Sequence, residues 1–222
     1  MEASEGDHSS AGQKGALNMS CKKIVIICGG ECRCENISKE IFENAFVIAA
    51  DSGYDTAKKL GVTPDLLVGD MDSIGQVPDD VPVHRVKAEK DDTDTMLAAD
   101  IACDMGAEEI EIVGGGGGRA DHFLSNIFLL ESLAERGVKA ALHDGINSIR
   151  FVSDSTVRLA NKGGYFGILA LEDSMVTAEG CKYPLRDAPL KRSLPYAVSN
   201  EVTEEYATVT VKGKVLITES VK

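Results

Sequence analysis

The chain has 222 residues, 43% of them hydrophobic, which is enough to bury the core of one large or two modest domains. Its 36 Asp and Glu residues outnumber its 23 Lys and Arg residues, and the net charge of -13 argues against nucleic acid and anionic membranes as partners. The sequence has no apolar run of about 18 residues and no secretory signal near its start, so we expect a cytoplasmic protein.

The first half of the chain alternates between two kinds of pattern. Residues 1–20 are rich in Ser, Gly and charged residues and show no periodicity, which predicts a disordered tail. From residue 21 to 148, short apolar runs typical of strands alternate with amphipathic segments typical of helices, such as 93–106 and 121–137. The strand patterns cover 23–28, 46–51, 65–70, 109–114 and 139–144. We therefore predict an α/β domain with a mostly parallel sheet flanked by helices, and ligands bound at the carboxyl ends of its strands.

The pattern changes after residue 148. Residues 149–222 contain short β-rich runs, separated by Gly or charged turns, and no long helical pattern. We predict a smaller all-β sandwich domain here. The run VTVKGKVLIT predicts a hairpin that turns at Gly213.

Two carboxylates follow one of the apolar strands. The stretch DLLVGDMDSI places Asp70 and Asp72 two residues apart, so in an extended segment both point to the same side. Paired carboxylate oxygens suit Mg²⁺, which also takes water and substrate phosphate oxygens. The alternative is that both are ordinary turn or capping residues.

A second acidic group precedes the helical pattern at 93–106. Asp91, Asp92 and Asp94 lie close together in KDDTD, and clustered like charges repel each other unless a positive charge lies between them. A divalent ion shared with Asp70 and Asp72 would supply that charge. Helix capping by Thr93 or an Asp explains part of this group, and ion pairs with the nearby lysines are a rival explanation.

Five glycines connect a strand to a helix in EIVGGGGGRADH. Glycine lets backbone N–H groups approach phosphate oxygens, the helix N-terminus adds positive potential, and Arg119 can bind a phosphate with two donors. The segment therefore predicts a phosphate-binding loop, although it lacks the Lys of a Walker A motif. A flexible loop with Asp121 as the helix cap is the alternative.

The same loop allows a dinucleotide-binding interpretation. Gly115, Gly117 and Ala120 match the Rossmann fingerprint, and Asp144 follows a later strand at a spacing that suits a ribose-binding acid. This interpretation predicts an oxidoreductase and leaves both acidic groups without a role. The six cysteines include no C-x-x-C pair, so we expect free thiols.

Several motifs together resemble one enzyme family. AADSGYDTAKKLGVTPDLLVGDMDSI, KDDTD, GGGGGRADH, KYPLRDAPL and VSNE occur in the order and spacing of thiamine pyrophosphokinase, especially its bacterial forms. The resemblance covers nearly the whole chain from about residue 22. It implies transfer of a pyrophosphoryl group from ATP to the hydroxyl of thiamine, giving thiamine diphosphate and AMP, by a homodimer. A protein that binds nucleotide or thiamine without turnover is a further alternative.

The resemblance also implies roles for individual residues. Its Mg²⁺ ligands would be Asp70, Asp72 and Asp94, which with Arg119 would form the catalytic set. Residues near them would bind the nucleotide, namely Asp51, Gly53, Thr93, Gly117, Gly118, Arg119 and Asp121. Ser199 and Asn200 would bind thiamine, at a site on the dimer interface. The sequence departs from the family at 51–55, where it reads DSGYD in place of the frequent DGGAN, and at Met71, where Phe is common.

Overall fold

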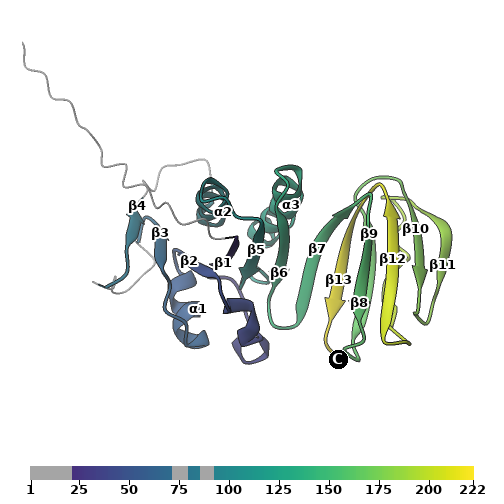
Figure 1. The fold of residues 1–222 in the computed structure, drawn as a ribbon, viewed down its shortest axis with the longest axis horizontal. Coiled ribbons are helices and arrows are strands. Elements are labelled where there is room, and N and C mark those ends of the chain that lie inside the picture. Colours follow the sequence, from purple (N-terminus) through teal and green to yellow (C-terminus); the bar gives the residue numbers. More distant parts are fainter. Residues whose placement is uncertain (1–21, 72–79, 86–92) are drawn as a thin grey trace, which may run out of the picture.

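The computed structural model describes residues 22–71, 80–85 and 93–222. Within them, nine strands form one large sheet in the order β4-β3-β2-β1-β5-β6-β7-β13-β9 (Figure 1). In chain order these strands are β1 Lys23–Ile27, β2 Phe46–Ala50, β3 Leu66–Gly69, β4 Val83–Arg85, β5 Glu109–Val113, β6 Lys139–His143, β7 Asn147–Ser153, β9 Tyr165–Ala170 and β13 Lys214–Ser220.

The six strands β1 to β6 run parallel. On one side of the β1–β5 pair lie β2, β3 and β4 in that order, and on the other side lies β6. The residues of β1, β2 and β3 are buried on both faces, which explains why the sequences of these three strands are nearly continuous apolar runs. Because the strand order reverses between β1 and β5, a crevice is expected outside the carboxyl ends of these two strands.

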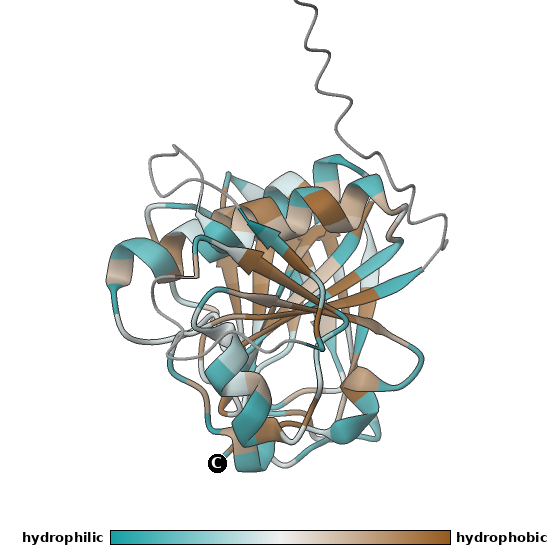
Figure 2. Cartoon of the chain, turned by 90° about the vertical axis from the view of Figure 1, so that its left-hand side faces the viewer, coloured by the Kyte–Doolittle hydropathy of each residue, from teal (hydrophilic) through white to brown (hydrophobic). Residues whose placement is uncertain are grey.

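Helices cover both faces of the parallel part. The helices α2, Asp94–Asp104, and α3, Ala120–Glu135, pack on one face, where Ile26 and Ile112 contribute to the core together with Leu130. The other face is covered by α1, Gly53–Leu60, and by the 3₁₀ turns η1, Cys34–Asn36, and η2, Lys39–Phe42. Figure 2 shows the apolar strands at the centre and hydrophilic residues on the outer sides of the helices.

A second, antiparallel sheet packs against the far end of the large one. Its order is β11-β10-β12-β8, and its inner face shares a core with β7, β9 and β13. The strands are β8 Thr156–Ala160, β10 Ser174–Glu179, β11 Leu185–Leu190 and β12 Tyr206–Lys212. The predicted fold class, a mostly parallel α/β sheet followed by a β-sandwich, is therefore confirmed.

The predicted hairpin at Gly213 is wrong. β12 pairs with β10 and β8, whereas β13 pairs with β7 and β9, so the two strands lie in opposite sheets. Both strands bury apolar residues in the same core, Val211 from β12 and Val215 from β13, and they reach it from opposite sides. Gly213 has φ +107°, which lets the chain turn sharply from one sheet to the other.

The large sheet continues through the predicted domain boundary. Residues 148 and 149 both lie in β7, which pairs with β6 of the α/β part and with β13 of the sandwich.

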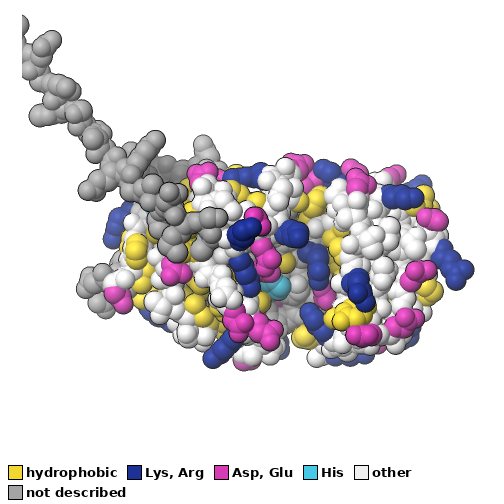
Figure 3. Space-filling model, viewed as in Figure 1, with side chains coloured by type: hydrophobic (Ala, Val, Ile, Leu, Met, Phe, Trp, Pro, Cys, Tyr) yellow, Lys and Arg dark blue, Asp and Glu magenta, His cyan; other side chains and the backbone are white. Residues whose placement is uncertain are grey.

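The surface between the two halves is hollowed, with cavities of about 460 and 890 Å³ that are both lined by His143, Ser148 and Lys162. Acidic and basic side chains are interspersed over the face shown in Figure 3. No helix in the described part of the chain is long and apolar enough to cross a membrane.

Candidate active site

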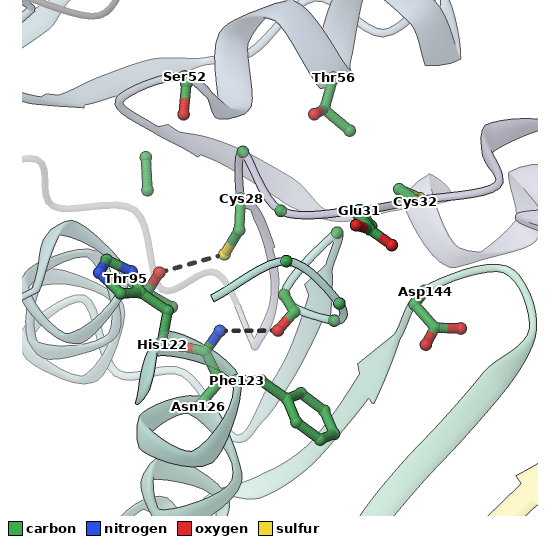
Figure 4. Close-up of a pocket in the computed structure, with 18 of the residues that line it drawn as sticks. Cys28, Glu31, Cys32, Ser52, Thr56, Thr95, His122, Phe123, Asn126 and Asp144 are labelled. Carbon is green, nitrogen blue, oxygen red and sulfur yellow. Dashed lines mark hydrogen bonds between the residues drawn. The ribbon is translucent and has the colours of Figure 1, made fainter. Parts of the chain in front are cut away.

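A cavity of about 800 Å³ lies outside the carboxyl ends of β1, β2, β5 and β6. The loop after each of these strands contributes to its wall, and so do the first residues of α2 and α3. This is the edge where the sequence predicts ligand binding and where the strand order reverses. Figure 4 shows how the side chains from these loops converge.

Close backbone packing shapes the floor of the cavity. The β1 and β5 loops lie so near each other that a Cβ atom on Gly30 would come within 2.5 Å of the Gly114 carbonyl oxygen. Gly114 itself has φ +75°, and its N–H donates to the His143 carbonyl at 2.9 Å. Larger residues at these positions would push the two loops apart, so the glycines are needed for the loop packing.

A side chain of α3 supports the glycine loop, residues 114–118. Gly117 and Gly118 have φ of +60° and +62°, a conformation that glycine adopts without strain. The buried side chain of Asn126, on α3, donates a hydrogen bond of 2.9 Å to the Gly115 carbonyl. The loop is therefore tied to the helix whose N-terminus points at the cavity, an arrangement suited to an anion.

Arg119 and Asp121 lie where the glycine loop enters α3. Arg119 is the N-cap of the helix, and Asp121 lies in its first turn. Two guanidinium nitrogens of Arg119 donate to the Asp121 carboxylate, at 2.6 and 3.2 Å. The pair raises the pKa of Arg119 and lowers that of Asp121, chiefly through the side-chain hydrogen bonds. Because both side chains are largely exposed, the ion pair is weak, and Arg119 can exchange Asp121 for a phosphate group.

Asp51 lies at the end of β2 in an unusual environment. Its φ of +46° is rare for a residue other than glycine. Its Oδ1 atom is buried and has no hydrogen-bond partner among the described residues. A Cβ atom on Gly69, at the end of β3, would lie 3.2 Å from the Asp51 Cβ, so the two strand ends are in contact.

The N-terminus of α2 lies on the opposite side of the same cavity. Thr93 is its N-cap, and Asp94 is its first residue. The Thr93 hydroxyl accepts a hydrogen bond of 3.2 Å from the Met96 N–H, which confirms that Thr93 caps the helix. Asp70 directly follows β3, at the same edge of the sheet, and is not among the residues that line the cavity. Among the described residues, no three His, Cys, Asp or Glu side chains are grouped closely enough to hold a metal ion. Asp72, Asp91 and Asp92 lie outside the described residues.

Cys28 connects the end of β1 to α2. Its Sγ lies 3.3 Å from the Thr95 hydroxyl, and the two groups share a hydrogen bond (Figure 4). Burial raises the pKa of this thiol to about 11, and the negative charge of Asp94 contributes to the rise. The thiol is therefore neutral near pH 7, which makes it a weak nucleophile.

Ser199 and Asn200 lie in the sandwich and do not line this cavity. Asn200 is buried, and its side chain bonds both backbone groups of Tyr183: Oδ1 accepts from the N–H at 3.0 Å and Nδ2 donates to the carbonyl at 2.8 Å. Ser199 is exposed, with φ +57°. The structure thus shows a fixed loop that presents Ser199 to solvent.

The cavity gathers several of the residues that the sequence points to. They are Asp51, Thr93, Asp94, Gly117, Gly118 and Arg119. Others were not predicted, namely Cys28, Glu31, Ser52, Thr56, Thr95, His122 and Asn126. One signal could have found two of these, since His122 and Asn126 are four residues apart and therefore share a face of α3.

Comparison with known proteins points to one family. A family model described as the thiamin pyrophosphokinase catalytic domain matches residues 37–142, and one for its vitamin B1 binding domain matches 154–216. The thiamine pyrophosphokinase of Bacillus subtilis (strain 168) is 30% identical over 210 residues, covering 88% of this chain and 97% of that protein.

Solved structures agree with the sequence matches. The crystal structure of the Bacillus subtilis enzyme superposes with a TM-score of 0.80 at 28% identity, covering 90% of this chain and 100% of that one. The thiamin pyrophosphokinase of Geobacillus thermodenitrificans gives a TM-score of 0.77 at 26% identity, covering 90% and 98%. The Candida albicans enzyme, at 14% identity, shares the fold with a TM-score of 0.74 and coverage of 91% of each chain.

Proposed function

Because this chain belongs to the thiamine pyrophosphokinase family, we propose that its 800 Å³ cavity is where ATP passes a pyrophosphoryl group to the hydroxyl of thiamine. The products are thiamine diphosphate and AMP. The observation that carries this assignment is the position of the cavity, which lies at the reversal of strand order in the catalytic domain and has the glycine loop and the acids Asp51 and Asp94 in its wall. The dinucleotide-binding alternative is not favoured, since it gives these acids no role.

Phosphoryl transfer depends mainly on positioning and on neutralising charge, and the residues at this site can supply both. The glycine loop and the α3 N-terminus would hold phosphate oxygens through backbone N–H groups. Arg119 would bind a further oxygen pair once it releases Asp121, which would stay beside it to orient the guanidinium. Thr93 would fix the start of α2, and Gly53 would allow α1 to pack against the end of β1.

We propose Mg²⁺ as the cofactor, held by Asp70, Asp72 and Asp94 with Asp51 beside them. The support is chemical: these side chains offer only oxygen ligands, and the buried Asp51 Oδ1 has no hydrogen-bond partner among the residues that the structure describes, so a cation could serve as its partner. When bound, Mg²⁺ would neutralise negative charge on the phosphate oxygens. Asp72 lies outside the described residues, so its part in the set rests on the sequence.

Thiamine needs a binding surface beyond this cavity. We propose that Ser199 and Asn200 supply it to a second copy of the chain, in a homodimer with the thiamine site at the interface. Large apolar side chains exposed on both parts support this, since an interface would cover them. They are Leu124 and Phe128 on α3, and Leu194, Tyr196 and Val198 just before Ser199. Asn200 would fix the loop, and Ser199 would contact the ligand.

The remaining assignments follow from this function. We propose a catalytic, ATP-binding unit at 21–148 and a thiamine-binding unit at 149–222, in a cytoplasmic protein. The decisive experiment is incubation with ATP, Mg²⁺ and thiamine, followed by separation of the products. AMP and thiamine diphosphate in equal amounts would support the assignment, whereas ADP or no product would contradict it.

A further inference from the structure

The reaction geometry divides the cavity into two ends. The attacking hydroxyl and the leaving AMP oxygen lie roughly in line on opposite sides of the β-phosphorus. The nucleoside must therefore extend away from the phosphate-binding region in the direction opposite to thiamine. If the phosphates lie between the glycine loop and the acids Asp51 and Asp94, the nucleoside occupies the end of the cavity beyond the glycine loop.

That far end is lined by the loop after β1 and the turn after β6. In Figure 4, Glu31, Cys32 and Asp144 lie on one side of the cavity and Ser52 and Thr95 on the other. Two carboxylates at this end would repel a polyphosphate chain, so this end suits a ligand group that donates hydrogen bonds. Ribose hydroxyls are such donors, and carboxylates often bind them in nucleotide sites.

Asp144 is already engaged by its own turn. Its Oδ1 accepts from the backbone N–H groups of Ile146 and Asn147, at 2.7 and 2.6 Å. Its Oδ2 accepts from the Asn147 side chain at 2.8 Å. These three bonds account for the shape of the turn, so a structural role explains Asp144 fully.

Glu31 is different. Its backbone N–H donates to the Gly116 carbonyl at 3.0 Å, and a Cβ atom on Gly117 would lie 2.5 Å from the Glu31 Cβ. The backbone of Glu31 is thus fixed against the glycine loop, and its side chain is exposed. Its carboxylate nevertheless forms no hydrogen bond or ion pair within residues 22–71, 80–85 and 93–222.

We propose that Glu31 accepts hydrogen bonds from the 2′- and 3′-hydroxyls of the ATP ribose and so makes the enzyme selective for ribonucleotides. This inference rests on the proposed function, because it needs the β-phosphate between the glycine loop and the acids. It assigns ribose recognition to Glu31, where spacing in the sequence points to Asp144.

The test compares ATP, 2′-deoxy-ATP and 3′-deoxy-ATP in three proteins: wild type, Glu31→Ala and Glu35→Ala. Alanine keeps the Cβ that packs on Gly117 and removes both acceptor oxygens. Glu35 is an exposed acid four residues away that does not line the cavity, so its replacement controls for the lost charge. Both kcat/KM and the calorimetric Kd of each nucleotide would be measured, so that the comparison does not depend on turnover.

We expect wild type and Glu35→Ala to prefer ATP over both deoxy analogues by about 10-fold or more, and Glu31→Ala to lose most of that preference through a weaker affinity for ATP. An unchanged ATP-to-deoxy ratio in Glu31→Ala would overturn the inference. A rise in the thiamine KM instead would also overturn it, since the carboxylate would then face the other substrate. Failure of wild type to form AMP and thiamine diphosphate would contradict the proposed function, while the Kd ratios would still decide the role of Glu31.

Discussion

The side-chain amide of Asn126 donates a hydrogen bond to the carbonyl of Gly115, and this contact ties the middle of α3 to the glycine loop. Asn126→Ala leaves that buried carbonyl without its partner, at a cost of about 1–3 kcal/mol in the free energy of unfolding. We expect a higher KM for ATP as well, because the loop loses its support, and an unchanged KM for thiamine. Thermal unfolding and steady-state kinetics would measure both effects.

Asn161→Ala is the matched control for this prediction. Its amide also donates to a backbone carbonyl, that of Glu204 at 3.0 Å, and it lies in the sandwich away from the cavity. It should lower Tm slightly and leave both KM values unchanged. If Asn126→Ala behaves in the same way, the bond serves stability alone.

Arg119→Lys keeps the positive charge and removes the planar pair of donors. We predict a loss of at least about 10-fold in kcat/KM for ATP, since a lysine cannot bind two phosphate oxygens side by side. The same substitution at Arg136, which pairs with Asp100 at 2.5 Å near the other end of α3, should leave the kinetics unchanged. Equal activity in the two variants would show that Arg119 does not bind phosphate.

Asp51→Asn should separate stability from activity. Asparagine tolerates a positive φ and removes the charge from a buried oxygen that has no partner among the described residues, so Tm should stay the same or rise. Turnover should fall by roughly 100-fold or more, because the site loses a carboxylate beside the proposed Mg²⁺ position. The rise in Tm that Mg²⁺ produces in the presence of ATP should shrink too.

Asp55→Asn is the control for that variant. Asp55 pairs with Lys58 on the surface of α1 and does not line the cavity, and asparagine is the residue that the family often has there. It should keep wild-type activity and the full Mg²⁺ response. A wild-type Mg²⁺ response in Asp51→Asn would rule out a role for Asp51 at the metal.

The parallel sheet could be predicted because buried parallel strands are continuous apolar runs. The edge with the site could be predicted because ligands of such sheets bind outside the carboxyl ends of the strands. β7 was not recognised, since its alternating run NSIRFVS has one face toward each of two layers and so lacks a uniform pattern. The hairpin error at Gly213 has a related cause. Two adjacent β patterns do not reveal whether their strands lie side by side or in opposite sheets.

For the site, the motifs at the strand ends were informative, and the contacts between residues distant in sequence were not visible. The acids and Arg119 stood out by charge and by their place after the strands, whereas the contacts that Asn126 and Glu31 make with the glycine loop cannot be read from the sequence. Asn200 shows the converse. The sequence offers it as a ligand contact, and the structure commits its side chain to the backbone of Tyr183.

Acid should weaken the loop that carries Ser199 and Asn200. Hydrogen bonds from Lys182 and Lys222 lower the pKa of Glu201 from 4.5 to about 2. Because the folded-state pKa is depressed, this pair of contacts contributes its full stability above about pH 4.5 and loses it as the pH falls toward 2. The Tm difference between wild type and Glu201→Gln should therefore shrink over that range.

Glu179→Gln serves as the control, since Glu179 is exposed on β10 and its carboxylate has no ion pair in the part of the chain that the structure describes. Its Tm difference from wild type should be small and should not follow the same pH window. A constant difference for Glu201→Gln down to about pH 2 would mean that the two lysines do not hold the carboxylate in solution.

The last prediction concerns a site shared between two chains, and it can be tested with heterodimers that carry two different tags. Arg119→Ala removes the proposed phosphate contact from the cavity, and Ser199→Arg places a positive charge where thiamine, itself a cation, is proposed to bind. If each site combines the cavity of one chain with the Ser199 loop of its partner, a heterodimer of these two variants has one intact site. It should then show about half of wild-type activity. A heterodimer of wild type with a chain carrying both substitutions should be inactive, because each of its sites contains one defect. If both parts of the site come from one chain, the two results are reversed, and the proposal of a shared thiamine site fails.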